Sequence, residues 1–224
     1  MITIAASTLN FLNELKKNNS REWFNEHKPD FLVEQQKAKN FYTALEEQLK
    51  THDQIDKFKL FRIYRDVRFS KDKTPYKPHF AGSFSRATNR LRGGYYLRIR
   101  PGESFLAGGF WEPNKEDLLR IRKELEMDAS EMRTIITNPH FVHHFGTLHG
   151  DALKTAPRGF DKEHPDMDLI RMKQFIVMRN FTDEEVLAPN FFDEVSQSFK
   201  VMRPYFDYMS EILTTDLNGV SIID

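Results

Sequence analysis

The 224-residue sequence contains no cysteine. This absence excludes disulfides, thiolate nucleophiles, zinc–thiolate sites and iron–sulfur clusters, and with them a secreted disulfide-rich scaffold. Long apolar runs are also missing, because no stretch approaches the roughly eighteen residues of a membrane-spanning helix. Residues 1–15 lack the basic and apolar regions of a signal peptide. We therefore expect a soluble, cytoplasmic protein with no membrane partner.

The common catalytic signatures are missing as well. There is no Gly-x-Ser-x-Gly elbow, no Gly-x-x-x-x-Gly-Lys phosphate loop and no Gly-x-Gly-x-x-Gly segment opening a helix. Four histidines and an aspartate fall within residues 140–151, but their spacing matches no metal signature, so packed or exposed histidines are the favoured interpretation. The sequence predicts no catalytic residue and no metal ligand. It leaves open whether the protein is an enzyme and which cofactor, if any, it uses.

Phenylalanine, by contrast, is abundant, with 20 Phe against 7 Tyr and 2 Trp. Large flat rings favour a core that is strongly driven by apolar burial. With 39% hydrophobic residues, a chain of 224 residues can bury a sizeable core without cross-links. We predict a single globular domain over residues 1–224.

Helices are predicted at both ends of the chain. In residues 29–49 the apolar positions recur at three- and four-residue steps, which is typical of an amphipathic helix facing a core. A second long helix is predicted from about residue 190 to residue 209. Shorter helices are expected where a side chain can accept a hydrogen bond from main-chain N–H groups. The expected starts are at Thr8, Ser20, Asn114, Asp128 and Thr182.

Strands are predicted in the middle of the chain, at residues 58–65, 95–100, 105–111 and 175–180. Turns as short as Pro101-Gly102 require antiparallel neighbours. Helices, then a meander, then helices indicate an α+β fold with a mostly antiparallel sheet packed against several helices. Gly108-Gly109 inside a strand predicts a bulge or a close backbone approach, and residues 146–168 form the longest expected loop.

Positive charge is concentrated in one part of a chain whose net charge is zero. Residues 57–100 contain thirteen Lys or Arg and two Asp, which leaves +11 in this region and −11 in the remainder. Such asymmetry indicates either a basic surface for an anionic partner or a cleft that attracts anions.

The densest part of this region is residues 61–77, which leave a predicted strand and enter a loop. Arginines at three-residue spacing cannot share one face of a strand, so a curve or bulge after Tyr64 is needed for them to converge. Converging guanidinium and ammonium groups would bind the oxygens of a phosphate or carboxylate. The predicted ligand-binding residues are Arg62, Arg65, Arg68, Lys71, Lys73, Tyr76 and Lys77.

The same residues allow a structural interpretation. Asp66 and Asp72 can pair with two of the arginines while the lysines stay solvated. Two acids cannot neutralise six bases locally, which favours a site, although acids elsewhere in the chain could complete the pairing. Tyr76 and Trp111 offer rings on which a base could stack, and packing in the core is the favoured interpretation of both.

Several blocks of residues carry a family resemblance. They are FLxEL at residues 11–15, NNxREWF at 18–24, FRxxRDxRFSKDKxPYK at 61–77, GGFWxP at 108–113 and LKxxPxGF at 153–160. From about residue 9 to about residue 213 the chain resembles a family of conserved hypothetical proteins from bacteria and fungi, catalogued as a domain of unknown function. The resemblance implies a single domain and supplies no catalytic residue, substrate or cofactor.

Three functions remain compatible with the sequence. The leading hypothesis is binding of a phosphorylated small molecule or nucleotide through the basic cluster. The second is a nucleic-acid-binding module that uses residues 57–100 and whose affinity falls steeply with salt. The third is an interaction or structural protein without a ligand, in which the charges form internal ion pairs. Ligand identity and oligomeric state do not follow from the sequence.

Overall fold

The computed structural model describes residues 2–223. Contacts between Cα atoms divide the chain into two compact units, each built from segments that are far apart in sequence. The first unit comprises residues 1–84, 96–106 and 180–197, and the second comprises residues 85–95, 107–179 and 198–224. That residues 1–224 form one domain stays a prediction.

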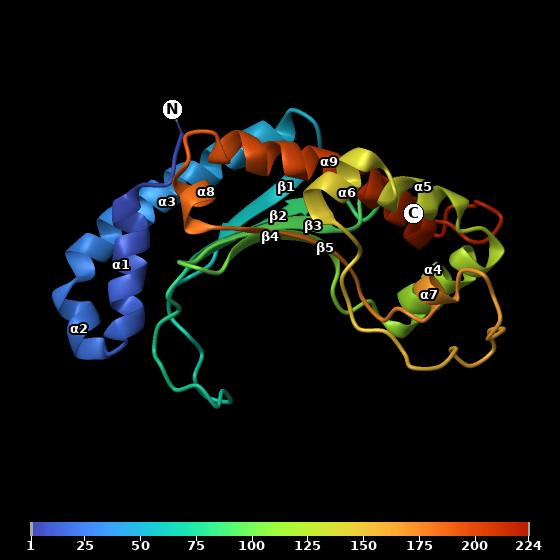
Figure 1. Cartoon of the computed structure of the whole chain (residues 1–224), viewed down its shortest axis with the longest axis horizontal. Coiled ribbons are helices and arrows are strands. Elements are labelled where there is room, and N and C mark those ends of the chain that lie inside the picture. The colour runs from blue at the N-terminus through green and yellow to red at the C-terminus, as the bar shows by residue number, and fades with distance from the viewer. Residues whose placement is uncertain (1, 224) are drawn as a thin grey trace. The chain divides into compact units, whose positions relative to one another are not determined.

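The elements follow one another as helices, a strand meander and then mostly helices (Figure 1). The helices of the described residues are α1 (Ala6–Lys17), α2 (Arg21–Glu26), α3 (Lys28–Lys50), α4 (Lys115–Met127), α5 (Ser130–Ile136), α6 (Pro139–Phe145), α7 (Met167–Ile170), α8 (Asp183–Leu187) and α9 (Phe191–Thr214). The strands are β1 (Ile55–Leu60), β2 (Phe80–Arg86), β3 (Gly94–Ile99), β4 (Ser104–Phe110) and β5 (Phe175–Phe181). They form one antiparallel sheet in the order β1-β2-β3-β4-β5, which confirms the predicted α+β class. None of the helices in residues 2–223 is long and apolar enough to cross a membrane.

Helix caps explain where most of the predicted helices begin. Ser20 and Thr182 each accept a main-chain hydrogen bond at the start of α2 and α8, as predicted. Thr8 does not act as a cap, because α1 already begins at Ala6. The Thr8 hydroxyl instead donates to the buried carboxylate of Glu34 on α3, at 2.7 Å. A tertiary partner that local sequence does not reveal therefore engages this hydroxyl.

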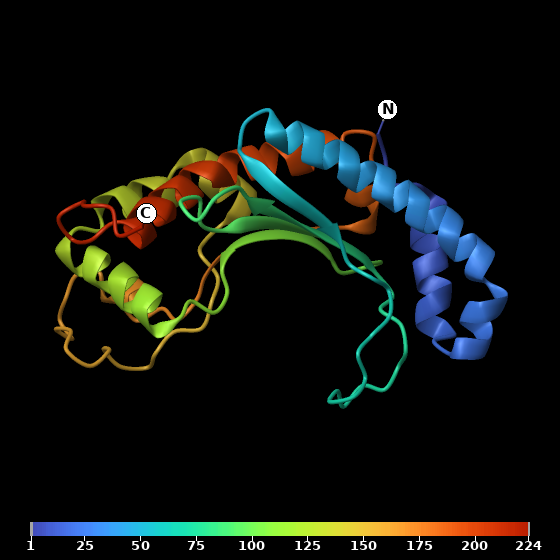
Figure 2. The ribbon, with the colours of Figure 1, turned by 180° about the vertical axis from the view of Figure 1, so that it is seen from behind.

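In the first unit, α3 runs along β1 and buries its apolar face (Figure 2). Tyr42 lies at the centre of this contact and is fully buried. Its hydroxyl lies 3.3 Å from the main-chain oxygen of Phe80 and 3.1 Å from that of Leu97. Gly82 leaves room for the ring, because a Cβ there would lie 2.7 Å from Tyr42 Cδ1. This contact covers one face of β2 and β3 with α3. The opposite face of these strands is not covered by α3.

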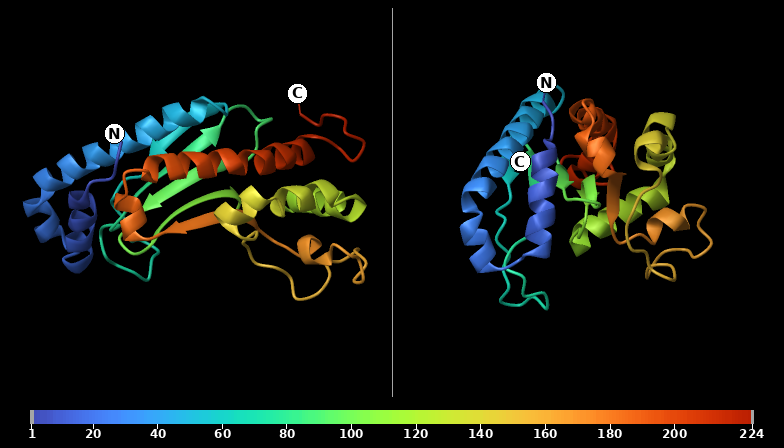
Figure 3. Two further views of the ribbon diagram at one scale, coloured as in Figure 1. Left: turned by 45° about the horizontal axis from the view of Figure 1, so that its top comes forward. Right: turned by 60° about the vertical axis from the view of Figure 1, so that its left-hand side comes forward.

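In the second unit, rings from the C-terminal part of α9 pack on the sheet. The ring of Tyr95 lies 4.9 Å from that of Phe199 and 5.0 Å from that of Phe206. Helices α5 and α6 lie beside this part of α9 (Figure 3). Burial of such large rings accounts for the high phenylalanine content.

Gly109 makes the close backbone approach that the sequence predicts, and Gly108 lies close to side chains of α9. A Cβ on Gly108 would lie 2.3 Å from Met202 Sδ. Gly109 has a φ of +122°, and a Cβ there would lie 2.2 Å from the main-chain oxygen of Phe175 on β5. Both positions therefore require glycine for steric reasons.

The strand predictions are confirmed for β3, β4 and β5, each within one residue at either end. The strand predicted at residues 58–65 is wrong in its bounds, because β1 begins at Ile55 and ends at Leu60. Strand β2 was not predicted, since its sequence FAGSFSR contains small residues in place of β-branched ones. The predicted loop 146–168 is confirmed as far as Asp166, and short bridges attach it to the segment that leads into β5.

Candidate functional site

Residues 61–79 form a two-stranded ribbon, called here the basic hairpin, that extends away from the sheet of the first unit (Figure 2). The Arg65 N–H donates to the main-chain oxygen of Pro75 at 2.8 Å, and Tyr64 and Tyr76 form an antiparallel bridge. The two sides of the basic block are thus paired next to the sheet, and residues 66–74 form a loop, as predicted.

A bulge separates the basic hairpin from β1 and β2. The main chain of Lys77 pairs with that of Ile63 at 2.8 Å, whereas the next pair joins Phe61 to Ala81 at 2.8 Å. One residue on the first strand therefore stands opposite three on the second, and His79 is one of the three. Because bulges bend a strand and redirect side chains, this feature curves the ribbon, but it lies before Tyr64 and on the opposite strand from the one expected, and it does not bring Arg62, Arg65 and Arg68 together.

Helix α2 and the turn before it hold the basic hairpin in place. The side-chain amide of Asn19 donates to the main-chain oxygen of Tyr76 at 3.0 Å and accepts from its N–H at 3.1 Å. The ring of Tyr76 stacks on Phe24, with centroids 4.0 Å apart and planes 18° from parallel. Tyr76 is only 4% exposed, so its ring serves the core packing that was the favoured interpretation.

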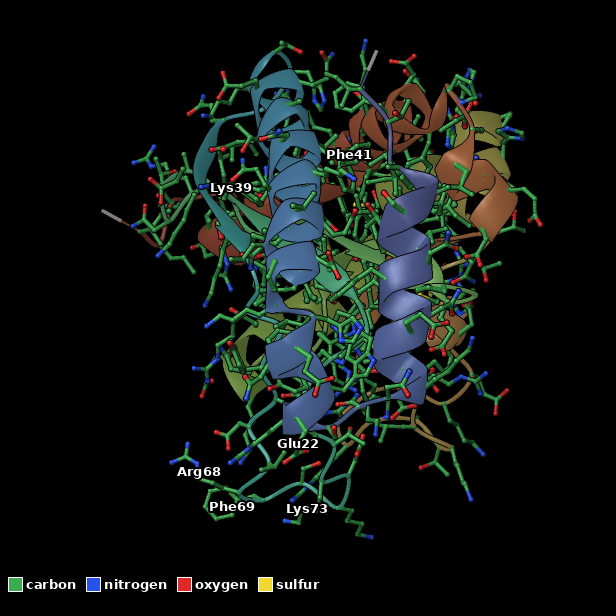
Figure 4. All side chains as sticks on the ribbon, turned by 90° about the vertical axis from the view of Figure 1, so that its left-hand side faces the viewer. Glu22, Lys39, Phe41, Arg68, Phe69 and Lys73 are labelled. Carbon is green, nitrogen blue, oxygen red and sulfur yellow. The ribbon has the colours of Figure 1, made fainter. Side chains whose placement is uncertain are left out.

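The tip of the basic hairpin, residues 66–74, presents its side chains outward (Figure 4). The guanidinium of Arg68 donates to both carboxylate oxygens of Asp66, at 3.0 and 2.7 Å, and this lowers the pKa of Asp66. The ring of Phe69 is 96% exposed. The Lys73 ammonium donates to a main-chain oxygen within the tip at 2.9 Å.

Four cations act on the ring of His79 where the basic hairpin joins the sheet, and they are called here the cation cluster. Its members are Arg65, Lys77, Arg98 and Arg100. In the described part of the chain, two carboxylates pair with this cluster. Asp72 lies 2.7 Å from Arg65, and Glu103 lies 3.2 Å from Arg100 and 3.6 Å from Arg98. The local pairing of Asp66 and Asp72 that the structural interpretation expects is therefore present.

His79 is the common neighbour of the cation cluster. Burial, together with the positive charges of Arg98, Arg100, Lys77 and Arg65, lowers the pKa of its imidazole from 6.5 to about 4. The ring is therefore neutral at pH 7. Its Nδ1 is buried and has no hydrogen-bond partner within residues 2–223.

Three aromatic rings continue the site across the sheet face opposite α3, and they are called here the aromatic row. On β3 the half-buried Tyr96 and Arg98 alternate with buried residues, which places both on this face. The Tyr96 ring lies 6.2 Å from that of Phe61 and 5.5 Å from that of Phe105. The guanidinium of Arg98 stacks over Phe105 at 4.3 Å, so the aromatic row touches the cation cluster.

The predicted site residues fall into three groups. Arg65 and Lys77 belong to the cation cluster. Tyr76 is buried beneath the basic hairpin. The remaining four lie on the exposed surface of the basic hairpin and are Arg62, Arg68, Lys71 and Lys73.

Five residues of the site were not predicted from the sequence, and they come from the base of the basic hairpin, from β3 and the position directly after it, and from β4. These are His79, Tyr96, Arg98, Arg100 and Phe105. The alternation within residues 95–100 was a signal that could have placed Tyr96 and Arg98 on one face. Nothing local to that strand indicates that residues 65–79 lie beside it.

The histidines considered as metal ligands lie in the second unit. His140, His143 and His144 are on α6, while His149 pairs through its main chain with Ile176. Among residues 2–223 no group of three or more histidine or carboxylate side chains has the geometry of a metal site.

Comparison with known proteins identifies the chain by its sequence. A search of curated proteins finds no match. The model of a family described as "Conserved hypothetical protein (DUF2461)" matches residues 7–208, a range that includes the basic hairpin, the cation cluster and the aromatic row. The chain therefore belongs to the DUF2461 family of conserved hypothetical proteins.

Proposed function

We propose that the first unit binds a nucleotide, with the phosphates on the cation cluster and the base on the aromatic row. The proposal rests on the contact between the cation cluster and the aromatic row, where the Arg98 guanidinium lies 4.3 Å over the Phe105 ring. A ligand with both a phosphate and an aromatic ring would contact both groups at once.

The charge of the cation cluster supports the proposed binding of phosphate. Four cations and two paired carboxylates leave an excess of two positive charges beside a neutral histidine. Guanidinium groups bind phosphate oxygens in pairs, and such charge-assisted bonds are stronger than neutral ones.

The aromatic row supports the proposed binding of the base. Its three rings are half-buried, so each keeps part of its surface accessible. Stacking of a base on such a ring contributes about 1–3 kcal/mol and tolerates any base. The row therefore selects for an aromatic group, and it leaves the identity of the base open.

A nucleic-acid strand is the second candidate, and the tip of the basic hairpin favours it. Arg68, Lys71 and Lys73 lie there around the exposed Phe69, whose ring is 5.9 Å from the Arg68 guanidinium. A strand that starts on the cation cluster could continue along these residues, whereas a mononucleotide could not reach them. Binding of a strand would fall steeply with salt because phosphate neutralisation releases counterions.

Titration calorimetry with inorganic phosphate, AMP, ATP and a twelve-nucleotide single strand tests both candidates, at about 50 and 200 mM salt. The proposal expects AMP to bind more tightly than phosphate, because only AMP reaches the aromatic row. Tighter binding of the strand than of ATP, with a steep salt response, would favour the second candidate. Absence of binding by all four ligands would leave the charges as internal ion pairs and refute both.

Variants locate the site. Arg100→Gln should weaken AMP binding by about tenfold, since a charge-assisted hydrogen bond contributes about 1.5–3 kcal/mol. Tyr96→Leu should weaken AMP and leave phosphate unchanged. Arg68→Gln is the matched control, because Arg68 lies at the tip and is already paired with Asp66. An equal loss in Arg68→Gln and Arg100→Gln would mean that general charge, not the cation cluster, attracts the ligand.

A further inference from the structure

The second unit contains a pocket of about 100 Å³ formed by α4, α5, the end of α9 and the segment after it. Acidic side chains dominate its polar lining, and Ile212 and Leu217 supply apolar surface. The polar residues are Arg120, Glu124, Glu131, Tyr208, Glu211, Thr215 and Asp216.

The one arginine of this lining is fully engaged. Arg120 donates to the main-chain oxygens of Thr215 at 2.9 Å and Asp216 at 3.0 Å, and its Nη1 lies 2.6 Å from Glu124. These bonds attach the segment after α9 to α4 and neutralise Glu124. Arg120 therefore forms a wall of the pocket, and the carboxylates of Glu131, Glu211 and Asp216 set its charge.

Tyr208 gives the pocket an unused hydroxyl. The residue is 6% exposed, and its oxygen is buried without a hydrogen-bond partner among residues 2–223. Burial raises the pKa of the phenol, and the negative charges of Glu124 and Glu131 raise it further, which places the oxygen near the acidic lining. An unsatisfied buried hydroxyl is costly and calls for a partner.

Two features define the partner. The carboxylates of Glu131 and Glu211 are exposed at the rim, where they attract a cation. In the described residues no three acidic or histidine side chains are arranged to hold a metal ion. The cation must therefore carry its own N–H donors and an apolar part.

We propose that this pocket binds the ammonium end of a small aliphatic amine. The ammonium group donates to the Tyr208 oxygen and to Glu131, while its methylene chain lies against Ile212 and Leu217. A pocket of about 100 Å³ admits only the end of such a molecule. A second amine on a longer chain would lie at the rim, near Glu211.

The test uses ethylamine and 1,4-diaminobutane as probes, with potassium and tetramethylammonium chloride as comparison cations, in titration calorimetry and thermal unfolding of the full chain. The diamine should bind at least tenfold more tightly than ethylamine, and neither comparison cation should stabilise the protein. Equal stabilisation by tetramethylammonium, which has no N–H donor, or by potassium would overturn the proposal.

Three variants assign the site. Tyr208→Phe keeps the ring and removes the hydroxyl, so it should fold at least as well as the wild type and bind the diamine at least tenfold more weakly. Glu131→Gln should also weaken binding, and it tests the pocket independently if Tyr208→Phe fails to fold. Glu126→Gln is the control, because Glu126 pairs with Lys123 at 2.7 Å and does not line the pocket. Unchanged affinity in both Tyr208→Phe and Glu131→Gln would refute the assignment.

Discussion

His79 should titrate near pH 4, far below the ordinary range of a histidine. The lowering from 6.5 to about 4 arises first from burial and then from the cation cluster. A change of this size is equivalent to roughly 3 kcal/mol, and solvent screening of a half-buried ring reduces it to about 1–2 kcal/mol. Because the pKa is lower in the folded state, this stability is present above pH 6.5 and is lost as the pH falls toward 4.

Side-chain ¹⁵N NMR of the histidines measures the pKa directly, and urea unfolding at pH 7.5 and pH 4.5 measures its effect on stability. His79→Gln removes the titrating ring, so between these pH values the variant should lose about 1–2 kcal/mol less stability than the wild type. Titration of His79 near pH 6.5, or equal pH dependence in both proteins, would show that the cation cluster does not act on this ring.

The same titration reports on ligand binding. A phosphate bound to the cation cluster would offset the charges that lower the His79 pKa, so AMP should raise this pKa. His79 would then take up a proton on AMP binding near pH 5. An unchanged His79 pKa at saturating AMP would place the phosphate elsewhere.

Four further variants test the packing. Tyr42→Phe should cost about 1–3 kcal/mol of unfolding free energy, measured in urea, because two buried main-chain oxygens lose the hydroxyl near them. Gly109→Ala should cost more than about 3 kcal/mol or prevent folding, since its Cβ would meet the Phe175 oxygen, and normal expression would contradict this. Glu34→Gln should lower stability by about 1–2 kcal/mol at pH 7. Burial raises the pKa of Glu34, but hydrogen bonds from Lys37 and Thr8 lower it overall, so the difference should shrink as the pH falls below 4.5. Phe69→Ala should change the melting temperature little because the ring is 96% exposed.

Much of the secondary structure could be predicted from the sequence, because it depends on interactions between residues that are close together in the chain. Ser20 and Thr182 cap helices because a hydroxyl three residues from a main-chain N–H needs no distant partner. Strands β3 and β4 follow from their alternation and from the short turn between them. Thr8 shows the limit of this reasoning, since its hydroxyl is taken by a carboxylate 26 positions away.

The candidate site likewise contains residues that the sequence predicts and residues that only the structure reveals. Charge counting within residues 57–100 finds the basic block, and Arg65 and Lys77 lie in the cation cluster as a result. His79 gives no signal, because a single histidine in a sequence has no particular pKa or direction. Its environment comes from the bulge that redirects it and from Arg98 on β3 and Arg100 directly after β3, about twenty residues further along the chain.

Composition, caps and alternation therefore determined the α+β class, most of the elements and the location of the positive charge in this chain. Tertiary structure alone decided that Arg98 and Arg100 join the cation cluster, that Tyr76 packs on Phe24, and that the Tyr208 hydroxyl faces acidic side chains. The physical reason is that caps and periodicity depend on neighbours within a few residues. Burial, the pKa of a side chain and the meeting of charges depend on segments that only folding brings together.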